Sequence, residues 1–397
     1  MGTLHLIIEL EESFQEIVIM EWVQHGSLLR QEDMNVFKFW QMESRIFSGL
    51  KGHHETVTSL SKKLVSDEDW AQWLDEKQTE RLESHQSGIT LLIGGRAEPR
   101  IPGMEVSYLP FSKPVCERVV QVFQIHRSIS RVINRNTTAA FSALTTNDPC
   151  TSRFELIYNC RSSSTWPNDL ALSVTYSPYK KATQAVLYGC CERARAKFIN
   201  RLSSCDFGAY HPLMLPTIFA EVERDRHFDI LSPLLTELVN RVEVMGVADA
   251  EEVVSDQSSQ SGSSTSEQPS PATQAPEHYM QLWLKISWLK NGLENWRQEL
   301  EKMISHCDEL RRSKFYIPDR SFESSVDVFD KEKSTLALFD ELADLEDSGS
   351  RMQQRLLELK GEYDDKIRAC TTIIDGMVLA AQLVSRDNYY ANLVSKS

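Results

Sequence analysis

Apolar residues recur in alternating steps of three and four over two long stretches in the last third of the 397-residue chain. This spacing lines up apolar side chains on one face of a helix, and a sustained run is typical of helices that pack together along a heptad seam. The first seam comprises Leu282, Ile286, Leu289, Leu293, Trp296, Leu300, Met303, Cys307 and Leu310. The pattern predicts a long helix that buries this line of side chains.

A second seam follows and contains one irregular step. Its members are Leu338, Leu342, Leu345, Gly349, Met352, Leu356, Leu359, Tyr363, Ile367, Cys370, Ile374, Met377, Ala381 and Val384. The extra step of four between Tyr363 and Ile367 is a stutter, which locally unwinds a supercoil. A helix over 338–392 would be about 80 Å long. We therefore expect residues 279–397 to form a helical hairpin of long antiparallel helices, with a coiled-coil-like stalk.

Shorter apolar runs in the middle of the chain predict strands. The segment GITLLIGGR at 88–96 ends in a glycine pair, and the segments 152–161 and 169–178 alternate and are rich in branched and aromatic residues. Helical spacing covers 113–135. Strands interleaved with helices predict an α+β or mixed α/β domain over 88–245.

The remaining regions have weaker patterns. Residues 1–87 are expected to be mostly helical, and 211–242 helical with a break at Pro233. Residues 246–278 are rich in Ser, Gln, Pro and acidic residues, and no Lys or Arg occurs between Val242 and Leu284. Such a segment buries too little apolar surface to offset its ordering entropy, so we expect a disordered acidic linker.

Charge and cysteine usage narrow the functional classes. The 43 basic and 57 acidic residues give a net charge of −14, which argues against binding to nucleic acid or anionic lipid. The eight cysteines form no CxxC pair, as is typical of reduced cytosolic thiols. No apolar run reaches the length that spans a bilayer, and the N-terminus lacks signal-peptide features. We therefore expect a cytoplasmic chain without a transmembrane span.

Five segments carry a resemblance to a known family. They are LPFSKPVCERVVQVFQIHRSISRVINR (109–135), WPNDLALSVTYSPYKKATQAVLYGC (166–190), HPLMLPTIFAEVERDRH (211–227), LKNGLENWRQELEKMISHCDEL (289–310) and EYDDKIRACTTIIDGMVLAAQ (362–382). In order and wording they resemble the cytosolic portion of fungal CorA-like magnesium-transporter proteins, from about residue 88 to the end. The resemblance implies a cytosolic α/β domain, a stalk helix over 338–392 and a link to Mg²⁺, the family's ion.

The resemblance also implies assembly. In that family the stalk helix enters the membrane and five subunits surround one pore. The family's Gly-Met-Asn pore motif is absent here, because Gly376-Met377 is followed by Val378. We therefore expect a soluble module, truncated or diverged from a transporter, that conducts no ion by itself. If truncated, the parent protein would lie in the membrane.

Two main hypotheses for the function remain open from the sequence, and a third, a cryptic hydrolase, rests only on scattered His and Cys residues. In the first, the chain has a structural or regulatory role and assembles through its stalk with copies of itself or with full-length CorA-like relatives. In the second, it is a coiled-coil adaptor unrelated to metal transport, regulated by phosphorylation of its Ser/Pro-rich linker. The two differ in whether Mg²⁺ changes the protein.

Candidate chemical groups are few. Asp340, Asp344 and Asp347 share one helix face and could ligate a hard cation, but their outward heptad positions favour a solvated face. A second set, His211, Glu221, Glu223 and His227, lacks zinc-site spacing and is expected to form salt bridges with Arg224 and Arg226.

Nucleophiles and phosphate-binding loops are not indicated either. The adjacent Cys190 and Cys191 are expected to pack on a helix, and the Asp-Phe-Gly at 206–208 lacks every other kinase motif. The sequence therefore predicts no catalytic, cofactor-binding or metal-binding residue, and no enzyme.

Overall fold

The computed structural model describes most of the regular elements of the chain. It covers residues 42–48, 58–64, 67–83, 88–95, 113–122, 139–147, 154–163, 166–178, 182–204, 211–252, 271–312 and 328–394, with positions 125, 126, 128, 129 and 132. These residues fall into two compact units. The first comprises Met1–Glu223 and Glu299–Leu357, and the second comprises Arg224–Gln298 and Glu358–Ser397.

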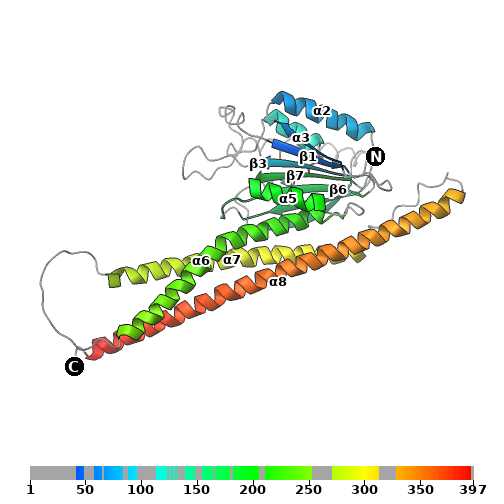
Figure 1. Ribbon diagram of the computed structural model, residues 1–397. Coiled ribbons are helices and arrows are strands. Elements are labelled where there is room, and N and C mark those ends of the chain that lie inside the picture. Colours follow the sequence, from blue (N-terminus) through cyan, green and yellow to red (C-terminus); the bar gives the residue numbers. More distant parts are fainter. Residues whose placement is uncertain are drawn as a thin grey trace, which may run out of the picture. The chain divides into compact units, whose positions relative to one another are not determined.

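A seven-stranded mixed sheet forms the centre of the first unit (Figure 1). The strands are β1 (Met42–Ser48), β2 (Thr58–Leu64), β3 (Gly88–Gly95), β4 (Ala140–Asn147), β5 (Phe154–Arg161), β6 (Ala171–Ser177) and β7 (Ala182–Cys190). Their spatial order is β2-β1-β3-β7-β6-β5-β4. β3 and β7 run parallel, whereas every other neighbouring pair is antiparallel. The prediction of a mixed α and β fold is confirmed.

Helices cover both faces of this sheet. Helices α2 (Asp67–Glu83) and α3 (Lys113–Val122) lie on one side, and α5 (Glu192–Ser204) lies on the other (Figure 1). Beneath α2 and α3, the side chains of Trp73 and Val119 pack in one apolar cluster with Leu92 and Val186. Seven of the eight side chains of β5 are buried, as expected for a strand covered on both faces.

Three long helices complete the described chain. They are α6 (Met214–Glu252), α7 (Pro271–Arg312) and α8 (Val328–Val394), and α8 alone has 67 residues. In the first unit, Gln353 of α8 donates to Asp308 of α7, and Arg311 of α7 donates to Ser350 of α8. As the residue number rises along α7 it falls along α8, so the two segments run antiparallel.

Burial follows the two heptad seams. All nine members of the first seam are buried on α7. On α8, where the structure describes side chains from Glu346, the second seam buries Leu356, Leu359, Tyr363, Cys370 and Met377. The other described members of this seam are less covered: Gly349, Met352, Ile367 and Ile374 are half-buried, and Ala381 is exposed. The buried line predicted from the sequence is therefore confirmed on α7, and on α8 only in part.

The N-terminal region differs from its expected mostly helical character. Strands β1 and β2 occupy Met42–Ser48 and Thr58–Leu64, α2 follows, and residues 1–41 lie outside the described residues. The segment TSLSKKL forms an edge strand with a single neighbour. An edge strand needs few apolar residues and often carries lysine, so its pattern is weak.

Two further parts of the structure differ from the sequence prediction: the course of α6 at Pro233 and the limits of the predicted linker. Helix α6 continues through Pro233, where a break was predicted. Proline removes one backbone hydrogen bond from a helix, and Pro233 lies on an exposed part of α6, where water can solvate the carbonyl that loses its partner. The ends of α6 and α7 extend into the predicted linker at 246–278, and residues 253–270 lie outside the described part of the chain.

Candidate functional site

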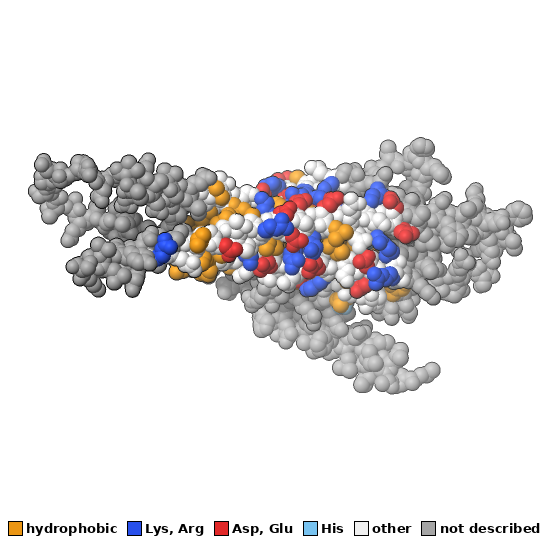
Figure 2. All heavy atoms as spheres, turned by 90° about the horizontal axis from the view of Figure 1, so that it is seen from below, with side chains coloured by type: hydrophobic (Ala, Val, Ile, Leu, Met, Phe, Trp, Pro, Cys, Tyr) orange, Lys and Arg blue, Asp and Glu red, His pale blue; other side chains and the backbone are white. Residues whose placement is uncertain are grey.

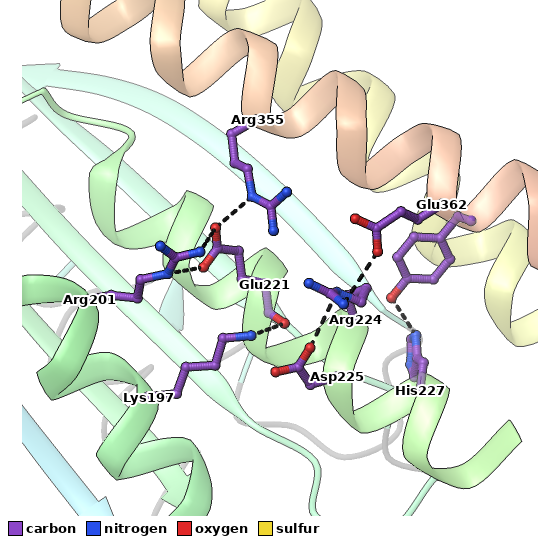
Figure 3. Close-up of polar contacts among 9 residues, drawn as sticks. Lys197, Arg201, Glu221, Arg224, Asp225, His227, Arg355 and Glu362 are labelled. Atoms are coloured by element: carbon purple, nitrogen blue, oxygen red, sulfur yellow. Dashed lines mark hydrogen bonds and ion pairs between the residues drawn. The ribbon is translucent and has the colours of Figure 1, made fainter. Parts of the chain in front are cut away.

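The carboxylate of Glu221 on α6 accepts hydrogen bonds from basic side chains of two other helices, α5 and α8 (Figure 3). Arg201 of α5 donates to both oxygens, with Nε 2.6 Å from Oε2 and Nη2 2.9 Å from Oε1. Arg355 of α8 donates from Nε to Oε1 at 2.7 Å. Lys197, one turn before Arg201 on α5, donates to the backbone carbonyl of Glu221 at 3.0 Å. These contacts connect α5, α6 and α8 within the first unit.

Burial makes this cluster stronger than an ordinary surface ion pair. The Glu221 side chain is 5% exposed, whereas those of Arg201 and Arg355 are 46% and 26% exposed. The bidentate contact with Arg201 also fixes the orientation of the carboxylate. Because the carboxylate oxygens are engaged by guanidinium groups, the arrangement is typical of a structural connection between helices.

A buried histidine caps the start of α6. The Leu213 amide donates to Nδ1 of His211 at 3.2 Å, and the Met214 amide donates to the His211 carbonyl at 3.0 Å. Pro212, which has no amide hydrogen, occupies the following position, where a helix needs none. Burial, with a smaller contribution from His306, lowers the pKa of His211 from 6.5 to about 3. His211 therefore serves α6 as a neutral cap.

A second histidine connects α7 to the sheet in the same unit. Nε2 of His306 lies 3.2 Å from the Tyr158 hydroxyl on β5, and Nδ1 lies 3.1 Å from a Glu309 oxygen. The Tyr158 ring stacks on Phe141 of β4, with ring centroids 6.1 Å apart. Nearby, the Glu299 carboxylate accepts the Phe141 amide at 2.8 Å. These contacts fix α7 against β4 and β5.

In the second unit, a buried His227 joins all three long helices. Nδ1 of His227 lies 2.8 Å from the Tyr363 hydroxyl, and its ring meets that of Trp296 edge-on at 6.4 Å. Arg226 donates to Nε2 at 3.3 Å. Because arginine only donates, the neutral ring carries its hydrogen on Nδ1 and donates to Tyr363.

Ion pairs on the same helices add to this junction. Arg224 of α6 lies 3.2 Å from Asp225 and 3.3 Å from Glu362 of α8, and Figure 3 shows these side chains beside the His227–Tyr363 contact. Arg297 of α7 lies 3.5 Å from Asp364. Each pair is partly exposed, so its contribution to stability is small.

The sequence candidates for metal ligation take other roles. Glu221 does form salt bridges, but with Arg201 and Arg355 rather than with Arg224 or Arg226. Asp347 pairs with Arg351 at 2.9 Å on an exposed surface. The side chains of Asp340 and Asp344 lie outside the described residues. Among the side chains that the structure describes, no three His, Cys, Asp or Glu residues are grouped to hold a metal ion.

The sequence predicted that Cys190 and Cys191 pack on a helix, and this prediction is wrong. Cys190 ends β7 and Cys191 precedes α5. Burial raises the pKa of Cys190, and it raises those of Cys116 and Cys307 to about 12, so these thiols are poor nucleophiles. The Asp-Phe-Gly segment at 206–208 lies outside the described residues.

Helix α7 carries a second apolar face in the second unit, which we call the outer face. It consists of Met280, Leu284 and Trp288, spaced four residues apart and 59%, 53% and 44% exposed. At 100° per residue this line lies roughly opposite the first seam. Figure 2 shows apolar side chains gathered on one stretch of the helical surface, and interleaved charges on another. Beyond Trp288 the same face becomes polar at Asn291 and Asn295.

Comparisons with known proteins leave the family of this chain open. No protein-family model matches the chain, and no curated protein matches it. None of the described helices combines the length and apolar character needed to cross a membrane.

Proposed function

We propose that the chain is a CorA-like cytosolic module with a structural or regulatory role in assembly. The resemblance implied an α/β domain joined to a long stalk helix, and the mixed sheet with the 67-residue α8 is consistent with that arrangement. The titratable groups described above connect helices and strands to one another. They support a structural role rather than catalysis.

The observation that carries the proposal is the presence of two apolar faces on α7. The first seam is buried within the chain, whereas the outer face exposes three large apolar side chains. Isolated exposed apolar residues are common, but an aligned run on a helix is typical of a surface that packs against another helix. A second copy of the chain supplies the same face and is the partner we propose.

Variants on this face test the proposal. Leu284→Glu combined with Trp288→Glu should weaken self-association at least tenfold, measured by sedimentation over a range of concentrations. Asn291→Glu combined with Asn295→Glu adds the same charge on the same helix face and is the matched control. Equal effects of the two pairs would contradict a role for the outer face.

The alternative function is a coiled-coil adaptor unrelated to metal transport. It shares the long helices but requires no response to magnesium. Thermal melting with MgCl₂, compared with NaCl at equal ionic strength, separates the two. A rise in Tm that is selective for Mg²⁺ supports the CorA-like module, because a ligand that binds only the folded state stabilises it. Identical melting curves favour the adaptor.

A further inference from the structure

Three polar side chains lie on the same sheet face beneath α3, on three neighbouring strands. Asn159 of β5 stands directly opposite Ser173 of β6, and Gln184 of β7 lies one pair further along, opposite Thr175. They share the face that carries Val186, a member of the apolar cluster under α2 and α3. Asn159 and Ser173 are 1% and 2% exposed. We call Asn159, Ser173 and Gln184 the polar island, because they lie at the edge of the apolar cluster under α2 and α3.

Each of the three side chains has a buried oxygen that lacks a hydrogen-bond partner among the described residues. These atoms are Oδ1 of Asn159, Oγ of Ser173 and Oε1 of Gln184. Leaving such an atom unsatisfied destabilises the fold, and folded proteins rarely leave several of them unsatisfied close together. Opposed residues on one sheet face have Cβ atoms about 5 Å apart, a separation that one bridging atom can span.

The neighbouring hydrogen bonds fix which way the Asn159 amide points. The Ser128 amide donates to Nδ1 of His126 at 3.2 Å, so this ring nitrogen is an acceptor. The Ser128 hydroxyl, 2.9 Å from the same nitrogen, must then donate to it and accept from elsewhere. Nδ2 of Asn159, 2.5 Å away, is that donor. Oδ1 is therefore the amide atom of Asn159 that lacks a hydrogen-bond partner among the described residues.

We propose that this island binds an ordered water molecule between Asn159 and Ser173. The water donates one hydrogen to Oδ1 of Asn159 and the other to Oε1 of Gln184, and accepts the hydroxyl hydrogen of Ser173. Three hydrogen bonds are typical of a buried water. The bridge would extend the chain of hydrogen bonds from His126 and Ser128 across β5, β6 and β7.

The donor and acceptor balance favours water over an ion. Two carbonyl oxygens and one hydroxyl offer no formal charge to replace the hydration shell of a divalent cation, which takes six or more oxygen ligands. The two carbonyl oxygens can accept the two hydrogens of one water molecule, and the hydroxyl can donate to its oxygen. The site therefore fits a small, neutral molecule that can donate two hydrogen bonds, which is water.

A high-resolution crystal structure of the whole chain tests the assignment. We expect a density peak about 3 Å from both Oδ1 of Asn159 and Oγ of Ser173. A direct hydrogen bond between these two side chains would overturn the proposal. A peak with cation-like coordination by additional oxygens would overturn it as well.

Unfolding of a Ser173→Ala variant gives an independent test. If water bridges the site, the change removes one of its partners, and the unfolding equilibrium constant should rise about fivefold. Without water, alanine would remove an unsatisfied hydroxyl and the constant would stay the same or fall, which would contradict the proposal. Ser177→Ala, further along the same strand and face, is the control and should change the constant less than twofold.

Discussion

At the scale of single residues, many of the described ion pairs lie within a single helix, but some charges connect one element to another. Glu221 illustrates this, because its buried carboxylate receives arginines from two helices. The sequence indicated salt bridges for this residue but not the correct partners, since Arg224 and Arg226 are near in sequence whereas Arg201 and Arg355 are brought close only by folding. Long-range partners of this kind carry no local signal.

Replacing Glu221 with Gln should destabilise the chain by about 2 kcal/mol. The change leaves two guanidinium groups facing a neutral amide; the loss stays below the 3–5 kcal/mol of a fully buried pair because Arg201 is 46% exposed. Urea unfolding measures the effect. Glu192→Gln, which breaks the exposed contact with Arg195, is the matched control and should cost less than about 0.5 kcal/mol. Similar losses in both variants would refute the special role of Glu221.

His211 should make the fold sensitive to mild acid. Its pKa is 6.5 when unfolded and about 3 when folded, so below pH 6.5 the unfolded chain binds a proton that the folded chain does not. The stabilisation is complete above pH 6.5 and is lost as the pH falls towards 3, by about 2 kcal/mol at pH 5.

The variant His211→Asn isolates this effect. The Asn oxygen can accept the Leu213 amide as Nδ1 does, but it does not titrate. The difference in unfolding free energy between the native chain and the variant, measured from pH 7.5 to 5, should change by about 2 kcal/mol. Parallel pH curves would show that His211 does not contribute.

At the scale of elements, the long helices were the most predictable part of the fold. Every member of the first seam is buried, because a heptad repeat is a local signal that the packing partner does not alter. The central strands β3, β5 and β6 were also predicted, since burial on both faces demands continuous apolar runs. Edge strand β2 and its neighbour β1 were missed, and so was edge strand β4, AFSALTTN, whose exposed Leu144 leaves its pattern weak. Central strand β7 was missed as well, and its last residue, Cys190, was expected on a helix.

Substitutions in the seam should cost far more than substitutions outside it. Leu293 of α7 is fully buried, so Leu293→Ala should lower the free energy of unfolding by about 2–5 kcal/mol. Leu357 of α8 is 50% exposed, and Leu357→Ala should cost less than about 1 kcal/mol. Denaturant titration of the two variants provides the comparison. Equal losses would contradict the assignment of the buried face.

At the scale of the whole molecule, the chain combines a mixed sheet with long helices, and some large apolar side chains of these helices remain exposed. Strands β3, β5 and β6, helix α7 and part of the buried line of α8 were within reach of the sequence. The capping of α6 by His211 and the polar island at Asn159 were not, because both depend on which buried groups meet after folding. The outer face of α7 is the feature on which the proposed assembly rests.

The mass of the native chain in solution is the most direct test of that connection. Light scattering coupled to size-exclusion chromatography should give a multiple of 45.5 kDa at micromolar concentration, because the exposed apolar line of α7 would be buried against a second copy. A mass of 45.5 kDa that does not change with concentration would contradict the proposed assembly.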